Sequence, residues 1–260
     1  MTFIDIHAHL EFFDNLDKII KKAKKRNVKI ILANGIDVET NKKVLAFAKE
    51  YPEVQACLGI YPANALKLIK KEIDSEIKII NENKDKIIAI GEVGLDLKEA
   101  GVETLVKQKE ILKKFVKLAK DLDKPIFIHS RKAEKETVDL LETLNYNKII
   151  MHCFNGKLNL VEKGIHRGWF FSIPTTVKFN EQFQEMIKII PIEQLFCETD
   201  SPFLHPDKKF PNEPANVIES YNKIAEIKGI PLADVEKKIE ENYRKLFLVK
   251  TTQQSLDKYL

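Results

Sequence analysis

Side chains that could bind metal ions recur along this sequence at corresponding places, where short apolar runs end. They are His7, His9, Glu92, His129, His152 and Asp200. Neutral imidazoles and carboxylates are common ligands of divalent cations in proteins. The first two of these residues close residues 2–9, which alternate in the manner of a strand. A strand has a side-chain period of two, so both imidazoles are expected to point to the same side.

The number of these side chains favours two metal ions over one. A single tetrahedral ion that keeps a water molecule needs only three protein ligands. Four imidazoles and two carboxylates fit two divalent ions about 3.5–4 Å apart, which lower the pKa of a shared water until hydroxide forms near neutral pH. We expect Glu92 to bridge the two ions, and Asp200 to accept a proton from the water as general base.

The elements that must position these ligands alternate regularly between strand and helix. We expect strands at residues 2–9, 28–33, 54–60, 87–92, 125–129, 148–152, 169–173 and 195–198. We expect helices at residues 16–26, 38–50, 72–83, 105–122, 134–144, 158–166, 181–189, 217–228 and 232–248. This alternation is typical of an α/β protein with a parallel sheet buried on both faces.

Eight such units in one chain predict a closed (β/α)8 TIM barrel, a single domain over residues 1–260, with an extra C-terminal helix. An open doubly wound sheet would require a glycine-rich phosphate turn after the first strand, and residues 7–10 (HAHL) do not supply one. In a barrel the active-site groups lie at the C-terminal ends of the strands, where the expected ligands are found.

Composition narrows the function classes. Hydrophobic residues make up 44% and charged residues 32% of the 260 residues, which excludes a disordered chain. The net charge of +4 allows a polyanionic partner without requiring one. The cysteines Cys57, Cys153 and Cys197 lack CxxC spacing and indicate reduced thiols of a cytoplasmic protein. We expect no signal segment and no membrane span, and the sequence leaves the oligomeric state open while allowing a monomer.

Seven short motifs carry a resemblance to a known family. They are DIHAHL at 5–10, GEVGLD at 91–96, PIFIHSR at 125–131, HCFNG at 152–156, IEQLFCETDSP at 192–202, NEP at 212–214 and NYRKLF at 242–247. In this order they resemble the TatD family of metal-dependent deoxyribonucleases, which belongs to the amidohydrolase-like barrels. The resemblance covers nearly the whole chain.

The resemblance implies both a site and an activity. It implies a metal centre built from the six side chains given above, holding divalent ions such as Mg²⁺, Mn²⁺ or Zn²⁺. It implies hydrolysis of phosphodiester bonds in nucleic acid, as in a deoxyribonuclease of the 3′-5′ exonuclease type that acts on DNA ends.

The sequence departs from the family pattern in loops that would contact substrate. Tyr61 stands where the family often carries a histidine, residues 97–98 (Leu-Lys) replace an aromatic pair, and Asn155 stands where serine is common. Residues 174–176 (Pro-Thr-Thr) replace a glycine-containing turn. Tyr61, Asn155 and His205 are therefore candidates for substrate binding at the mouth of the barrel.

Two further charged residues have two interpretations each. Arg131 could clamp a phosphate, or could form a structural ion pair with Glu198 or Glu92. Glu198 could orient a histidine ligand, or could be the buried partner of that arginine.

Two other functions use the same residues. An amidohydrolase-type enzyme would cleave a small amide, lactone or nucleobase substrate, but many dinuclear members of that group bridge their metals with a modified lysine, where this chain has Glu92. A non-catalytic metal- or nucleic-acid-binding module would be expected to lack a ligand, and none is missing.

Overall fold

The strands form one parallel sheet whose order follows the sequence from β1 to β8. The structure is a computed structural model and describes residues 2–248. Its strands are β1 (Phe3–Ala8), β2 (Val28–Asn34), β3 (Val54–Leu58), β4 (Ile87–Asp96), β5 (Ile126–Arg131), β6 (Ile149–Met151), β7 (Phe170–Pro174) and β8 (Leu195–Glu198). The last strand lies against the first, where Ala8 bridges Ser201 in parallel. The sheet therefore closes on itself, and the predicted (β/α)8 barrel is confirmed.

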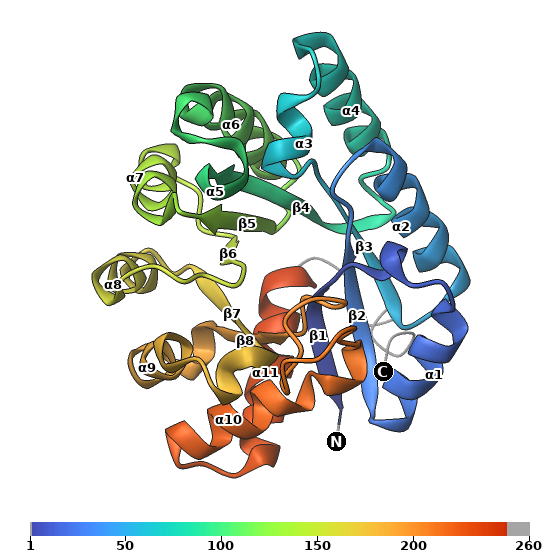
Figure 1. Cartoon of the computed structure of the whole chain (residues 1–260), viewed down its shortest axis with the longest axis vertical. Helices are drawn as coiled ribbons and strands as arrows, with labels where there is room; N and C mark the ends of the chain where they lie inside the picture. The colour runs from blue at the N-terminus through green and yellow to red at the C-terminus, as the bar shows by residue number, and fades with distance from the viewer. Residues whose placement is uncertain (1, 249–260) are drawn as a thin grey trace. The chain divides into compact units, whose positions relative to one another are not determined.

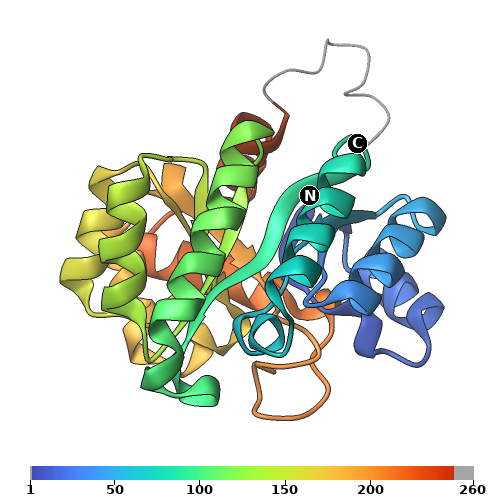
Figure 2. The same ribbon diagram turned by 90° about the horizontal axis from the view of Figure 1, so that it is seen from above.

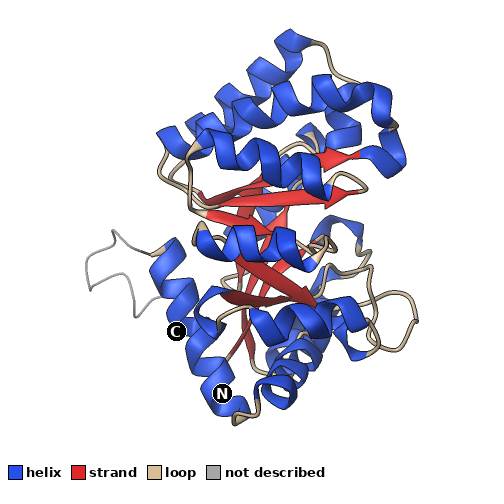
Figure 3. Cartoon of the chain, turned by 90° about the vertical axis from the view of Figure 1, so that its left-hand side faces the viewer, coloured by secondary structure: helices blue, strands red, loops and turns tan. Residues whose placement is uncertain are grey.

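Helices follow the strands along the chain. The α-helices are α1 (Leu16–Lys25), α2 (Val38–Glu50), α3 (Pro62–Leu66), α4 (Lys70–Glu82), α5 (Leu97–Ala100), α6 (Leu105–Asp121), α7 (Glu134–Leu144), α8 (Leu158–His166), α9 (Glu181–Ile189), α10 (Ile218–Lys228) and α11 (Leu232–Phe247). Short 3-10 helices occur at η1 (Leu10–Phe12), η2 (Val102–Thr104), η3 (Thr175–Lys178), η4 (Ile192–Gln194) and η5 (Pro214–Asn216). Figure 3 distinguishes the strands, in red, from the helices, in blue, that pack against them.

The described chain gathers into two compact units. Unit 1 comprises the described residues 2–33, 47–55 and 172–248, and unit 2 comprises residues 34–46 and 56–171. The prediction of one domain over residues 1–260 stays a prediction, and its ends, residue 1 and residues 249–260, lie outside the described residues.

Unit 1 holds β1, β2 and β8 with helices α1, α10 and α11. The apolar residues of β1 are buried on both faces, as parallel strands under helices require. Tyr221 of α10 fixes this strand, because its hydroxyl accepts a hydrogen bond from the backbone N–H of Ile4 at 3.0 Å and lies 3.1 Å from the carbonyl oxygen of the same residue. Helix α1 begins after Asn15, whose side chain caps it by accepting from the N–H of Lys18.

Unit 2 holds β4, β5 and β6 with helices α3 to α8. Helices α6 and α7 lie along one side of β4 and β5 (Figure 1). Helix α6 presents Leu112, Phe115 and Ala119 to β4, and all three are buried because they share one face of the helix. These contacts hold the two strands that carry the site residues of this unit.

Strand β4 is longer than the sequence predicts. It continues to Asp96, so Glu92 lies inside the strand and not at its end. Likewise, β5 continues to Arg131, two residues past His129. The physical reason is Gly94, which pairs with His129 and, having no side chain, lets the two backbones run close together beyond residue 92, where the strand was predicted to end.

The segment after β8 is a long loop, drawn in orange in Figure 2. Asn212, which is fully buried, fixes this loop at its base: its N–H donates to the carbonyl oxygen of Pro202 at 2.8 Å, and its side-chain amide donates to that of Thr199 at 2.9 Å. Internal hydrogen bonds thus hold the two ends of the loop together.

Among residues 2–248, every helix is too short or too polar to cross a lipid bilayer.

Candidate metal centre

In unit 1, three of the expected ligands converge. The Nε2 atoms of His7 and His9 are 3.2 Å apart, and Oδ1 of Asp200 lies 3.6 Å from the first and 3.4 Å from the second. The imidazole of His7 is fully buried, and that of His9 is nearly so. Two imidazole nitrogens and a carboxylate oxygen, all within 4.8 Å of one another, are a donor set that a divalent cation can use.

The backbone between β1 and β8 brings these side chains together. The N–H of Asp200 donates to the carbonyl oxygen of His7 at 2.9 Å, and the N–H of His9 donates to that of Ser201 at 2.7 Å. Asp200 adopts a left-handed conformation, with φ of 52°, which is uncommon for a residue with a side chain. Such a backbone persists where its surroundings hold it, and it often marks a functional position.

A buried pair below this group was missed by the sequence reasoning. The Asp5 carboxylate accepts hydrogen bonds from the N–H of Thr199 at 2.9 Å and from its hydroxyl at 2.6 Å. Burial raises the pKa of Asp5 to about 8, although the hydrogen bonds from Thr199 act to lower it. Because Asp5 lies two residues before His7 and Thr199 precedes Asp200, the pair ties the two ligand-bearing segments together. Both residues lie inside the recognised motifs, but their spacing alone does not show that they meet.

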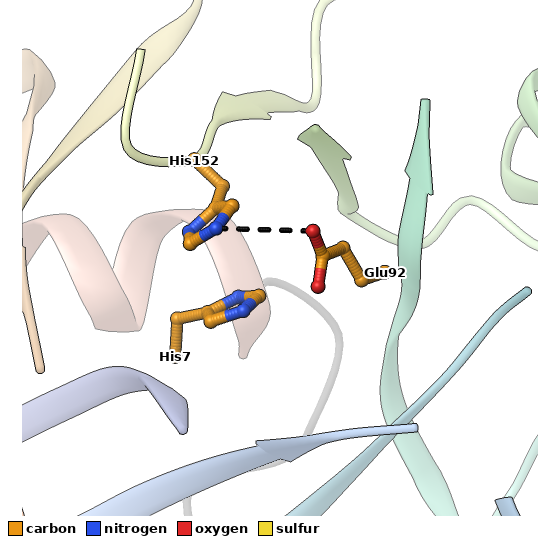
Figure 4. Close-up of side chains that lie close together, drawn as sticks. All are labelled: His7, Glu92 and His152. Carbon is orange, nitrogen blue, oxygen red and sulfur yellow. Dashed lines mark ion pairs between the residues drawn. The ribbon is translucent and has the colours of Figure 1, made fainter. Parts of the chain in front are cut away.

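In unit 2, the carboxylate of Glu92 lies close to two imidazoles. Its Oε1 atom lies 2.8 Å from Nδ1 of His129 and 3.8 Å from Nε2 of His152. Figure 4 shows the side chains of Glu92 and His152 pointing toward each other, from β4 and from the residue that follows β6. Glu92 and His152 are almost completely buried, so this carboxylate meets imidazole nitrogens in a poorly solvated setting.

Asp96 extends this cluster and was also missed. Its Oδ2 atom lies 3.2 Å from Nε2 of His129 and accepts a hydrogen bond from the hydroxyl of Tyr61 at 2.5 Å. Its other oxygen accepts from the N–H groups of Lys98 and Glu99, both at 2.8 Å, and so caps α5.

The pKa values of this cluster follow from burial and from these hydrogen bonds. Burial acts to raise the pKa of Asp96, but hydrogen bonds from His129 and Tyr61 outweigh it and leave the pKa well below its usual value. Burial acts to lower the pKa of His129, whereas its hydrogen bonds with Asp96 and Glu92 raise it above its usual value. The Tyr61 hydroxyl is held neutral, because burial and the hydrogen bond to Asp96 raise its pKa far above its usual value.

The remaining candidate residues lie in varied surroundings. Arg131 ends β5 and is exposed, Asn155 is exposed in the loop after β6, and Glu198 ends β8 and is fully buried. His205 is half-buried in the loop after β8, where its Nδ1 accepts a hydrogen bond from the N–H of Asp207 at 3.0 Å. The hydroxyl of Tyr61 makes its shortest contact with Asp96, and its role in substrate binding stays a prediction.

The donor chemistry of both groups fits divalent metal ions. Each group supplies two imidazoles and a carboxylate, the ligand types shared by Zn²⁺ and Mn²⁺ sites, and the carboxylates also suit Mg²⁺. The carboxylate of Asp96 provides the outer hydrogen bond that commonly orients a ligating histidine.

Comparisons with known proteins agree with this chemistry. A family model described as TatD-related DNase matches residues 4–248. Deoxyribonuclease TATDN3 of Homo sapiens is 35% identical over 257 residues, which is 94% of this chain and 94% of that protein. An uncharacterized metal-dependent hydrolase of Methanocaldococcus jannaschii is 35% identical over 250 residues, covering 95% of this chain and 97% of that one.

A solved structure has the same fold. The crystal structure of YJJV, a TatD homologue from Escherichia coli K12, superposes with a TM-score of 0.88 at 24% identity, over 95% of this chain and 98% of that one.

Proposed function

Since this chain belongs to the TatD-related DNase family, we propose that it is a divalent-metal-dependent deoxyribonuclease that removes nucleotides from the 3′ ends of DNA. The family resemblance drawn from the motifs is thereby confirmed, as is the expectation of an enzyme. The direction of digestion, the number of metal ions and the residues that bind them belong to the proposal.

We assign metal binding to each side-chain group. In a (β/α)8 barrel, side chains at the C-terminal ends of the strands form the active site. His7, His9 and Asp200 would hold a divalent ion in unit 1, and Glu92, His129 and His152 would hold one in unit 2. Mg²⁺, Mn²⁺ or Zn²⁺ would suit either set of donors.

Bound divalent ions would neutralise charge on the phosphate and lower the pKa of a water molecule. Within this chemistry, Asp200 accepts the proton of the attacking water, whose oxygen adds to phosphorus while the bond from phosphorus to the 3′ oxygen of the remaining strand breaks. That 3′ oxygen takes a proton from solvent, and the released mononucleotide keeps the phosphate. Asp96 holds the imidazole of His129 in one orientation, and Tyr61 holds Asp96. The side chain of Arg131 is exposed to solvent, and its guanidinium is suited to bind a phosphate of the substrate.

The observation that carries the proposal is the convergence of His7, His9 and Asp200, with nitrogen and oxygen atoms 3.2–3.6 Å apart. A carboxylate oxygen and two imidazole nitrogens this close together and this little exposed form a donor set that a divalent cation can join. Family membership then connects this donor set to phosphodiester chemistry.

The test is hydrolysis of single-stranded DNA labelled at either end, with Mg²⁺, Mn²⁺ or Zn²⁺ supplied separately. We expect mononucleotides to leave from the 3′ end and expect a chelator to abolish the reaction. Glu92→Gln should lower the rate at least about 100-fold, since loss of partners that merely support a metal ligand costs 10–100-fold.

A matched control is Glu82→Gln, which removes an exposed carboxylate from the end of α4. This variant should digest DNA at the parent rate. Release from the 5′ end would refute the proposed polarity. Metal-dependent hydrolysis of an amide or lactone, with no cleavage of DNA, would replace the nuclease assignment by the amidohydrolase alternative.

A further inference from the structure

Two exposed phenylalanines of unit 1 lie beside the ligand group of that unit. Phe12 in η1 and Phe203 in the loop after β8 are 49% and 45% exposed. Their ring centroids are 5.9 Å apart, with the planes at 70°, so they form an edge-to-face pair. Half of each ring therefore remains in water although the two rings are already in contact with each other.

The pair is adjacent to His9. The imidazole centroid of His9 lies 6.0 Å from the ring of Phe12 and 6.2 Å from that of Phe203. Backbone hydrogen bonds also connect the two phenylalanines to the ligand group. The N–H of Phe12 donates to the carbonyl oxygen of His9 at 3.5 Å, and the N–H of Phe203 donates to the carbonyl oxygen of Asp200 at 2.9 Å. Each aromatic ring is thus connected through its own backbone to a residue of the ligand group.

The backbone on both sides of Phe203 is held in place. The carbonyl oxygen of Pro202 accepts from the N–H of Asn212 at 2.8 Å, and that of Leu204 accepts from the hydroxyl of Thr175 at 2.6 Å. An exposed ring on a fixed backbone loses little conformational freedom when a ligand binds, which favours affinity.

We propose that Phe12 and Phe203 form a stacking surface for a nucleobase of the DNA substrate, at the nucleotide next to the phosphate that is cleaved. This inference rests on the proposed nuclease function and adds the means by which the substrate end is held. A phenyl ring has no hydrogen-bonding group, so it stacks on any base without selecting one. The surface suits single-stranded DNA, because a base within a duplex is already stacked on both faces.

The contribution of base stacking is measured as an affinity for DNA, so that the result does not depend on catalytic turnover. The full-length protein is titrated with a fluorescent single-stranded thymidine oligonucleotide whose 3′-terminal linkages are phosphorothioates, which slows cleavage. A second oligonucleotide is identical except that its two 3′-terminal nucleotides lack a base. We expect the parent protein to bind the first oligonucleotide about 5- to 100-fold more tightly, the range that stacking of one base spans.

Phe12→Leu and Phe203→Leu keep an apolar side chain but remove the aromatic face. Each should weaken binding of the thymidine oligonucleotide and leave binding of the abasic one unchanged, so the preference disappears. Phe210→Leu is the matched control, because Phe210 belongs to the same loop and is 73% exposed. This variant should retain the full preference. Circular dichroism establishes that all three variants are folded.

Equal binding of both oligonucleotides by the parent protein would overturn the proposal. So would leucine variants that keep the parent preference, since the rings would then serve only to pack the loop against η1. Hydrolysis of methyl p-nitrophenyl phosphate, which carries no nucleobase, tests the proposed function separately. Activity on this ester without a base preference in binding would overturn the stacking surface and leave the phosphodiesterase intact.

Discussion

Removing one hydroxyl group, in Tyr61→Phe, tests the network that supports His129. The Tyr61 hydroxyl donates to Oδ2 of Asp96 at 2.5 Å, and the same oxygen lies 3.2 Å from Nε2 of His129. The two rings also meet edge to face, with centroids 4.8 Å apart. Phenylalanine keeps this ring contact, so the substitution removes only the contacts of the hydroxyl, which also lies 3.4 Å from Nε2 of His129 and 3.3 Å from Oε2 of Glu99.

The size of the effect follows from the partners that remain. A hydrogen bond to a charged group contributes roughly 1.5–3 kcal/mol. The Asp96 carboxylate would still accept from the N–H groups of Lys98 and Glu99, both at 2.8 Å, and would still face His129. We therefore expect the free energy of unfolding to fall by about 2 kcal/mol, near the lower part of that range. In a chain of this length, such a loss lowers the melting temperature by about 4–8 °C.

The same change should weaken metal binding. Loss of a group that holds a ligating histidine in place costs about 10- to 100-fold in metal affinity. We expect about 10-fold here, because Asp96 itself remains. Calorimetric titration with Mn²⁺ measures this affinity, and thermal unfolding in chelator measures the stability.

Tyr146→Phe is the matched control for this prediction. The Tyr146 hydroxyl donates to the carbonyl oxygen of Lys124 at 2.6 Å and lies 3.2 Å from that of Ala119, in the same unit but among structural elements. This variant should lose about 1 kcal/mol of stability and no metal affinity. If Tyr61→Phe bound metal as the parent does, or if both variants lost affinity equally, the assigned role of the network would be refuted.

Two further substitutions test residues that support the structure of unit 2. Asn41→Ala removes an amide that donates to the carbonyl oxygen of Gly59 at 3.0 Å and to Oε1 of buried Glu76 at 2.7 Å. Urea unfolding should show that the free energy of unfolding falls by about 3 kcal/mol, and the folded variant should keep the parent kcat. A lowered kcat at full stability would contradict this structural role. Gly94→Ala would place its Cβ 2.0 Å from the carbonyl oxygen of His129, at a φ of +157°, and should cost at least about 3 kcal/mol and most of the metal affinity. A stable Gly94→Ala protein with normal affinity would show that β4 and β5 can move apart without cost.

Much of the fold follows from periodicity, because parallel strands under helices are apolar on both faces. The run 125–129 was recognised as a strand, and the observed β5 (Ile126–Arg131) overlaps it and continues two residues further. The boundaries were less certain where glycine occurs. The strand predicted at 87–92 ended before Gly94, whereas β4 runs through Gly91 and Gly94 to Asp96. The missing information was the partner strand, since the ladder continues only because Gly94 faces His129.

The ligand groups could be predicted from the sequence for a similar reason. Closed parallel topology sends every strand end to one face, so chemistry-bearing residues at strand ends could be combined before any distance was known. The residues that orient them could not be found in this way. Asp5 meets Thr199 across 194 positions of the sequence, and Tyr61 meets Asp96 across 35. Hydrogen bonds of this kind depend on the relative placement of a strand and a loop distant from it in sequence, which spacing does not encode.

The departures from the family motifs have a common centre in Asp96. Tyr61 replaces a histidine and residues 97–98 replace an aromatic pair, and the structure places both changes at this carboxylate. The Tyr61 phenol donates to Asp96 without carrying a charge, since its pKa lies far above its usual value. The residues at 97–98 now begin α5, which Asp96 caps. Both departures therefore lie beside the carboxylate that faces Nε2 of His129 at 3.2 Å, so substitutions at Tyr61 or at residues 97–98 are expected to act on that imidazole through Asp96.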